Sequence, residues 1–172
     1  FASRRFDRHE GGRMHVLSAA GILNVAPEQA MAADYHDLLR LTRHVTRSEA
    51  EVVAAYRHAV FNVLAHNRDD HLRQFGFLRR GGAWRRSPAY DLTFSDGPGG
   101  EHTLLVAGEG RRPQPAHLLE LAKQAGIRLR VERDVVDRVR GATARWSEFA
   151  EAAGVSTSSR KHVADALEAS DT

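Results

Sequence analysis

HNRDDHLRQFGFLRRGGAWRRSPAYDL, at residues 66–92, is the stretch of sequence that decides the fold. Its first six residues are all polar, and they come directly after an apolar segment. Phe75–Leu78 and Trp84–Ser87 then favour two short strands joined at Gly81-Gly82, and Pro88 ends the second strand. The stretch therefore predicts a polar loop on a rigid support, followed by a short β-hairpin.

Three polar side chains are placed around this hairpin at spacings that suit phosphoryl transfer. Asp69 precedes the hairpin, the amide of Gln74 follows five positions later, and Asp91 comes after the hairpin. Because a hairpin brings its two ends together, we expect these side chains to converge. One carboxylate would orient a hydroxyl and accept its proton, while the other, with the amide oxygen, would hold Mg²⁺ against phosphates. Taken singly, each aspartate also fits a solvated turn or a hairpin cap.

The segments before this stretch are helical by pattern. Thr46-Arg47-Ser48-Glu49 has the sequence of a capping box, and apolar residues follow at helical spacing up to His66. An earlier helix is expected over Tyr35–His44, and residues 13–66 as a whole are predicted to be helical.

The last third of the chain returns to helix after one extended segment over Thr103–Val106. Helices are expected over His117–Ala125 and Val131–Ala153, each followed by a glycine that can end it. A final helix is expected after Ser156 or Thr157, either of which can cap it. The sequence thus predicts a mostly α-helical domain with one small hairpin.

Length and composition agree with one globular domain or a fragment of one. The chain has 172 residues, of which 42% are hydrophobic and 27% charged. Its lack of cysteine excludes disulfides, thiolate metal sites and cysteine nucleophiles, and fits a cytoplasmic protein. No apolar run approaches the roughly 20 residues that cross a bilayer, so we expect no membrane insertion.

Charge and histidine content give weaker signals. The net charge is +3, and no predicted helix gathers basic residues as a DNA-recognition surface. Ten histidines are present, but none has the HExxH spacing of a zinc hydrolase. A free-standing DNA-binding domain and a zinc enzyme are therefore disfavoured.

Four motifs together resemble the C-terminal portion of HipA-like kinases, the bacterial toxin serine/threonine kinases of toxin–antitoxin systems. They are RFDR at 5–8, NRDDHLRQFGFL at 67–78, SPAYDL at 87–92 and EHTLLVAGEG at 101–110. The resemblance continues to ARWSEFAEAAGV at 144–155. It implies that residues 1–172 form the helical C-lobe of a HipA-like protein kinase, with the small β-hairpin at the active site.

The resemblance also implies roles for single residues. Asp69 matches the catalytic aspartate in a catalytic loop at 66–74, and Asp70 is disfavoured because the five-residue spacing counts from Asp69. Gln74 falls where the family has a metal-binding asparagine, and Asp91 matches a metal-binding aspartate in the segment 87–92. Arg4 and Phe6 fall in an expected hinge strand at 1–8 and would contact adenine. His71 and Tyr90 would lie near the phosphates of ATP. His71 is also expected to be a catalytic residue.

The cofactors and partners implied by the family are ATP, Mg²⁺ and a protein substrate such as an aminoacyl-tRNA synthetase. A helix-turn-helix antitoxin like HipB would restrain the toxin, and DNA would be met only through that antitoxin. The family's glycine-rich loop and upstream lysine have no counterpart, since Lys123 and Lys161 both follow the catalytic loop. We therefore expect that an N-lobe is missing from this chain and that the fragment alone is inactive.

One departure leaves a second interpretation open. Gln74 is longer by one methylene, roughly 1.5 Å, than the asparagine it replaces, and Mg²⁺ tolerates little distortion of its ligands. The alternative is a degenerate kinase lobe that binds an antitoxin without transferring phosphate.

Overall fold

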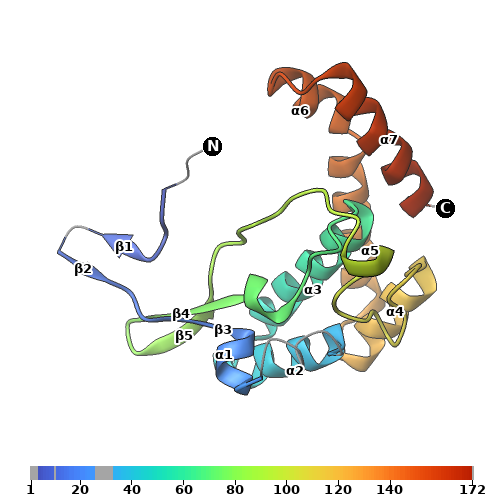
Figure 1. Cartoon of the computed structure of the whole chain (residues 1–172). Helices are drawn as coiled ribbons and strands as arrows, with labels where there is room; N and C mark the ends of the chain where they lie inside the picture. Colours follow the sequence, from blue (N-terminus) through green and yellow to red (C-terminus); the bar gives the residue numbers. More distant parts are fainter. Residues whose placement is uncertain (1–3, 10, 26–32, 172) are drawn as a thin grey trace.

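The computed structural model describes residues 4–9, 11–25 and 33–171 (Figure 1). Its N-terminal part contains β1 (Arg8–His9), β2 (Gly12–Arg13), β3 (Val16–Ser18), α1 (Ala19–Leu23), α2 (Tyr35–Thr46) and α3 (Glu49–Leu64). The middle contains the 3₁₀ turn η1 (Leu72–Gln74), β4 (Gly76–Arg80), β5 (Ala83–Arg86) and the 3₁₀ turn η2 (Pro98–Gly100). The C-terminal part contains α4 (Pro115–Gln124), α5 (Leu129–Thr143), α6 (Trp146–Ala152) and α7 (Thr157–Asp171). The described chain is thus mostly helical, as predicted.

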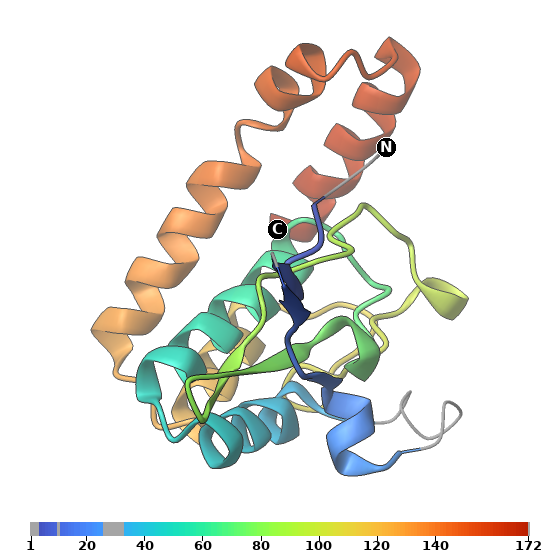
Figure 2. The ribbon, with the colours of Figure 1, turned by 90° about the vertical axis from the view of Figure 1, so that its left-hand side faces the viewer.

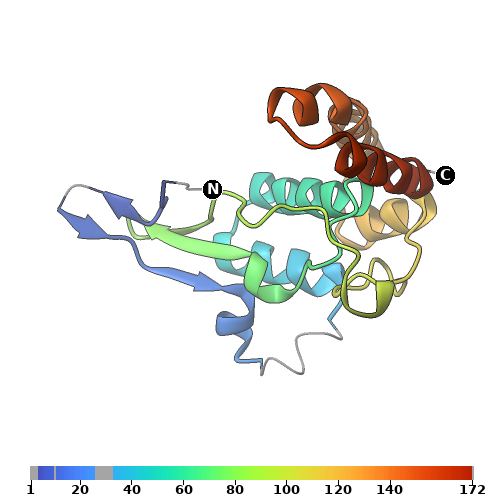
Figure 3. The ribbon, with the colours of Figure 1, turned by 45° about the horizontal axis from the view of Figure 1, so that its top comes forward.

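Helix α3 is the centre of the core. Apolar residues lie on most of its faces, so it is covered by α2, by α5 and by strand β5. The largest fully buried side chains come from α2, α3, η1, β4, α4 and the loop before α4: Tyr35, Tyr56, Phe77, Leu38, Leu39, Leu72, Leu104, Leu118, Leu121, Val52, Val60 and Val106. Figure 3 shows the strands at one end of α2 and α3 and the later helices at the other.

The N-terminal cap expected for α3 at Thr46 is wrong by two residues. Thr46 is the last residue of α2, and its hydroxyl donates to the Thr42 carbonyl at 2.7 Å. Arg47 then adopts a left-handed conformation with φ 52°, which stops α2. Ser48, with extended backbone, caps α3 by accepting a hydrogen bond from the Glu51 amide.

The predicted hairpin is present as β4 and β5, but it belongs to a three-stranded antiparallel sheet. Strand β3 pairs with β4, so that Val16 lies opposite Leu78 and Ser18 opposite Gly76. The helical reading of residues 13–66 is therefore wrong at β3. A three-residue strand has no periodicity of its own, and its partner lies about 60 residues further along the chain. Pairing with a distant strand decides its conformation.

The long helix expected over Val131–Ala153 is two helices. Helix α5 ends at Thr143, and α6 starts only at Trp146 after the chain changes direction. The indole N–H of Trp146 donates to the Arg160 carbonyl at 3.1 Å, which ties α6 to α7. Helix α7 then returns beside α5 (Figure 2). Contacts with α7 therefore override the continuous helical pattern.

The other predictions for the C-terminal part of the chain agree better with the structure. Helix α4 ends just before Gly126, which has a positive φ of 68°, and the Ser156 hydroxyl accepts a hydrogen bond from the Ser159 amide at the start of α7. The extended segment expected over Thr103–Val106 is reduced to isolated bridges at Leu105 and Val106. Within the described ranges, no helix has the length and apolar character needed to cross a membrane.

Candidate functional site

The polar loop after α3 is fixed by backbone contacts on both sides. His66 turns the chain with a positive φ of 53°, and the Asn67 amide donates back to the Asn62 carbonyl in α3 at 2.9 Å. The Arg68 amide donates to the Ser95 carbonyl at 3.1 Å, and the Ser95 amide donates to the His66 carbonyl at 3.0 Å. The loop is therefore held between helix α3 and the segment that follows the hairpin.

A buried polar network lies behind this loop and centres on Asp70. One carboxylate oxygen of Asp70 accepts from the Tyr35 hydroxyl at 2.7 Å and from His102 Nδ1 at 2.8 Å. The other oxygen accepts from the backbone amides of Thr103 at 2.7 Å and Leu104 at 3.2 Å. Asp70 is fully buried, so its lone pairs are used in holding the loop to the chain before α4.

Two amide side chains extend this network toward α3. Asn62 Nδ2 donates to the Tyr35 hydroxyl at 2.8 Å, and Asn67 Nδ2 donates to Asn62 Oδ1 at 3.0 Å. Burial, together with the negative charge of Asp70, raises the pKa of Tyr35 well above its ordinary value. Tyr35 therefore remains protonated and can donate to the carboxylate.

Asp69 has the opposite environment, although it is the next residue in the chain. Its side chain is 45% exposed, and the imidazole Nε2 of His71 lies 3.7 Å from its Oδ1. The oxygens of Asp69 are therefore available to a molecule outside the chain. The choice of Asp69 over Asp70 as a base stays a prediction, and the buried oxygens of Asp70 are not accessible to an outside molecule.

The hairpin brings Gln74 and Asp91 into contact, as the spacing led us to expect. Gln74 Nε2 donates to Asp91 Oδ2 at 2.6 Å. Asp91 adopts a left-handed backbone conformation with φ 55°, which is uncommon for a residue with a side chain and occurs often at functional sites. Gln74 is buried and Asp91 is exposed, so the pair lies at the surface of the loop.

Tyr90 joins the segment before β1 to this pair. Its hydroxyl donates to the Arg73 carbonyl at 2.6 Å, and its ring stacks on Phe6 at 5.9 Å between centroids. Burial and the nearby Asp91 raise the pKa of Tyr90, so the hydroxyl stays protonated. Phe6 is thus brought to the candidate site.

The other two expected site residues are placed differently. His71 is half-buried at the start of η1, and its Nδ1 is buried without a hydrogen-bond partner in the described part of the chain. Arg4 is exposed and takes no part in the contacts above. Of the hinge strand expected at 1–8, residues 1–3 lie outside the described residues, residues 4–7 are not in a strand, and Arg8 is in β1.

The polar atoms at the surface of the loop suit a magnesium ion better than zinc. In the residues that the structure describes, no three histidine or acidic side chains gather as a metal-binding group. Mg²⁺ needs only one or two carboxylates, with water and phosphate oxygens completing its shell. Asp91 supplies a carboxylate, and the Gln74 side chain in contact with it also carries an amide oxygen. This donor set fits Mg²⁺.

Most of the buried network was not predicted from the sequence. Asp70 was considered only as a second choice for the base, and no role was predicted for Tyr35 or His102. Asn62 was the available signal, because it is an amide within the apolar sequence of α3 and must find a buried partner.

The comparisons with known proteins agree on one family. The family described as HipA-like C-terminal domain matches residues 1–166. A chain in the Shewanella oneidensis MR-1 complex of the toxin–antitoxin proteins HipA and HipB with operator DNA has a similar structure, with a TM-score of 0.75 and 16% sequence identity. The match covers 96% of this chain and 46% of that one, so this chain spans about half the length of its structural neighbour. None of the curated proteins matches the sequence.

Proposed function

This chain belongs to the family of HipA-like C-terminal domains, and from that membership we propose that it is the catalytic lobe of a Mg²⁺- and ATP-dependent serine/threonine protein kinase. The observation that carries the proposal is the contact between Gln74 and Asp91, with Asp69 exposed in the same loop. Two oxygen ligands for Mg²⁺ and one accessible carboxylate are the groups that phosphoryl transfer requires.

In this mechanism each residue of the loop has a separate task. Asp69 orients the attacking hydroxyl and accepts its proton as the bond to the phosphorus forms and the bond to the leaving diphosphate breaks. Asp91 and Gln74 would hold Mg²⁺, which supplies charge neutralisation to the phosphates. Tyr90 supports Asp91 by fixing the backbone before it to the Arg73 carbonyl, and the Phe6 ring beside Tyr90 provides an apolar face for the nucleotide. His71, which is half-buried and lies beside Asp69, would approach a phosphate oxygen. Arg4, from the same segment as Phe6, would approach the adenine.

The biological setting of this proposal is a toxin–antitoxin system. Its support is the structural neighbour, which is described as a complex of HipA, HipB and operator DNA. The partner would be a helix-turn-helix antitoxin, with DNA contacted through it, and the phosphorylated protein would be an aminoacyl-tRNA synthetase, as the sequence resemblance implies.

The activity is tested by phosphoryl transfer in the full-length gene product. We expect Mg²⁺-dependent transfer of the γ-phosphate of ATP to a protein hydroxyl, and loss of that transfer in Asp91→Asn. Asp37→Asn is the matched control, because Asp37 is an exposed aspartate on α2 with only a 3.7 Å ion pair to Arg40. Equal transfer by the parent and Asp91→Asn would refute the assignment.

A second candidate function is an antitoxin-binding module without phosphoryl transfer. It is favoured by Gln74, which turns its amide nitrogen toward Asp91 and stands where the family has asparagine. Gln74→Asn separates the two functions. If Gln74 is a poor ligand in a working kinase, the shorter amide should raise turnover by about tenfold for each 1.4 kcal/mol recovered. If neither the parent nor this variant transfers phosphate but both bind the antitoxin, the module is the correct function.

A further inference from the structure

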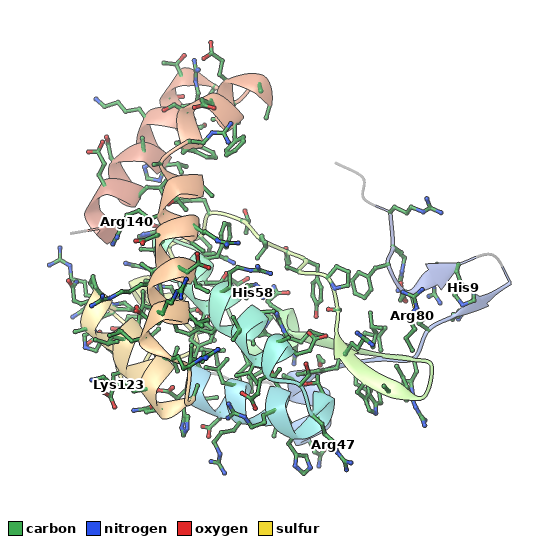
Figure 4. The ribbon with its side chains drawn as sticks, turned by 180° about the vertical axis from the view of Figure 1, so that it is seen from behind. His9, Arg47, His58, Arg80, Lys123 and Arg140 are labelled. Atoms are coloured by element: carbon green, nitrogen blue, oxygen red, sulfur yellow. The ribbon has the colours of Figure 1, made fainter. Side chains whose placement is uncertain are left out.

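A pocket separate from the Gln74–Asp91 pair lies between α3, α5 and the chain from Arg86 to Leu92. Its volume is about 530 Å³, which is within the range of small-molecule sites. Lining residues from α3 include Arg57 and His58, and α5 contributes Arg138. Figure 4 labels His58 on α3, on the side of the molecule where α5 lies.

His58 lines this pocket and holds Arg86 in it. The residue is only 7% exposed, and Arg86 Nη2 lies 3.0 Å from its Nδ1. Because a guanidinium can only donate, Nδ1 is the acceptor and the ring proton is on Nε2. Nε2 is buried and has no partner in the described residues. His58 therefore acts at the pocket through Nδ1, which holds the Arg86 guanidinium in place.

Arg86 is a half-buried cation without a paired anion. No carboxylate lies within ion-pair distance of its guanidinium in the described ranges, and its side-chain hydrogen bond goes to neutral His58. Burial lowers the pKa of Arg86, although the negative charge of Glu51 at the pocket partly opposes this effect. A buried charge is costly unless an opposite charge is brought to it.

The remaining charges of the pocket are also mainly positive. Arg57 is exposed and has no ion pair in the described part of the chain, whereas Arg138 is paired with Asp134 at 3.2 Å. Two unpaired guanidinium groups against one Glu51 carboxylate leave an excess of positive charge. Two guanidinium groups suit a doubly charged oxyanion better than a single carboxylate.

We propose that this pocket binds the phosphate group of a phosphomonoester, with Arg86 and Arg57 as its donors and with His58 holding the Arg86 guanidinium in position. The volume exceeds what a bare phosphate ion needs, so the carbon chain that carries the phosphate also has room. Pro88, Ala89 and Leu92 provide apolar wall for that chain. The site is independent of the proposed kinase activity, because none of its donors is placed at the nucleotide.

The test is a titration of the ¹⁵N-labelled chain with O-phosphoserine, inorganic phosphate and acetate, in the absence of ATP and Mg²⁺. We expect saturable binding of phosphoserine and phosphate that shifts the amide signals of His58 and of residues 87–92. Arg86→Gln should weaken phosphoserine binding about tenfold, as expected for a lost charge-assisted hydrogen bond. Arg85→Gln is the matched control, since Arg85 is the exposed neighbour on the same strand and does not line the pocket.

A second variant covers the case in which Arg86→Gln does not fold. Arg57 is exposed, so Arg57→Gln should leave the fold intact and weaken phosphoserine binding by about threefold, a share of the effect of one charged donor. The proposal is overturned if no saturable binding occurs, if acetate binds as tightly as phosphate, or if Arg85→Gln weakens binding as much as the pocket variants.

Discussion

Asp69 and Asp70 are neighbours in the chain, yet they belong to two regions with opposite properties. Asp70 belongs to the rear region, a fully buried network in which its two oxygens accept four hydrogen bonds. Asp69 belongs to the front region, where its side chain is 45% exposed and the His71 imidazole lies 3.7 Å away. Two identical side chains therefore have different uses, set by burial and by the number of donors.

This difference separates the residues that hold the loop in place from the residues to which we assign its chemistry. Each donor in the rear region is buried and paired, so removing one leaves an unsatisfied group in a medium of low dielectric constant. The front region has the Gln74–Asp91 contact and an accessible Asp69, and the exposed Asp69 side chain can be changed at little cost to folding. We expect rear substitutions to act on stability and front substitutions to act on chemistry.

The largest expected effect on stability is at Asp70. Asp70→Ala leaves the Tyr35 hydroxyl, His102 and two backbone amides without their acceptor, and should lower the free energy of unfolding by about 3–5 kcal/mol. Asp69→Ala should change it by less than about 0.5 kcal/mol, as for an exposed side chain. Urea unfolding followed by circular dichroism measures both. Similar losses for the two variants would remove the distinction between the regions.

The next largest effect is the dependence of stability on pH that His58 causes. Burial, the main cause, and the charge of Arg86 lower the pKa of His58 to about 4. As pH falls from about 6.5 to 4, His58 binds a proton in the unfolded chain but not in the folded chain. The free energy of unfolding therefore decreases across this pH range. The full loss is about 3 kcal/mol, from roughly 1.4 kcal/mol for each unit of pKa.

The measurement is the free energy of unfolding at several pH values, for the parent chain and for His58→Gln. The difference between the two curves isolates His58 from other groups, including His66, whose pKa burial also lowers. We expect the parent to lose more stability than the variant between pH 6.5 and 4. Parallel curves would show that His58 titrates normally in the folded chain.

A smaller effect is expected at the edge of the rear region. Tyr35→Phe keeps the ring but removes the hydroxyl that joins Asn62 to Asp70, and should cost about 1–3 kcal/mol of unfolding free energy. Tyr90→Phe is the control from the front, because its hydroxyl bonds a single carbonyl near the surface, and should cost less. If Tyr90→Phe were the more damaging change, the front region would be carrying stability.

The sequence predicts the front region better than the rear region. The five-residue spacing from Asp69 to Gln74 and the hairpin that leads to Asp91 are local features, so the contact of Gln74 with Asp91 followed from them. The rear network joins residues 35, 62, 70 and 102, and no local pattern relates positions that far apart. Its members come together only through the packing of α2, α3 and the segment before α4.

The same distinction explains the errors in secondary structure. Strand β3 is a strand because it pairs with β4, and the break between α5 and α6 is fixed by the Trp146 contact with α7. Helix α3 was predicted well because its apolar spacing is strong over sixteen residues. The conformation of a short element is determined by the distant segment that it contacts, whereas the conformation of a long periodic element is determined by its own sequence.

The most direct test of this division is the rate of γ-phosphate transfer by Asp69→Asn in the full-length gene product. The account predicts a rate at least about a hundredfold below that of the parent, since a general base contributes that much or more. It also predicts an unchanged urea midpoint in the same preparation, because Asp69 is exposed. A variant that transfers phosphate as fast as the parent would contradict the central claim that the front region carries the chemistry.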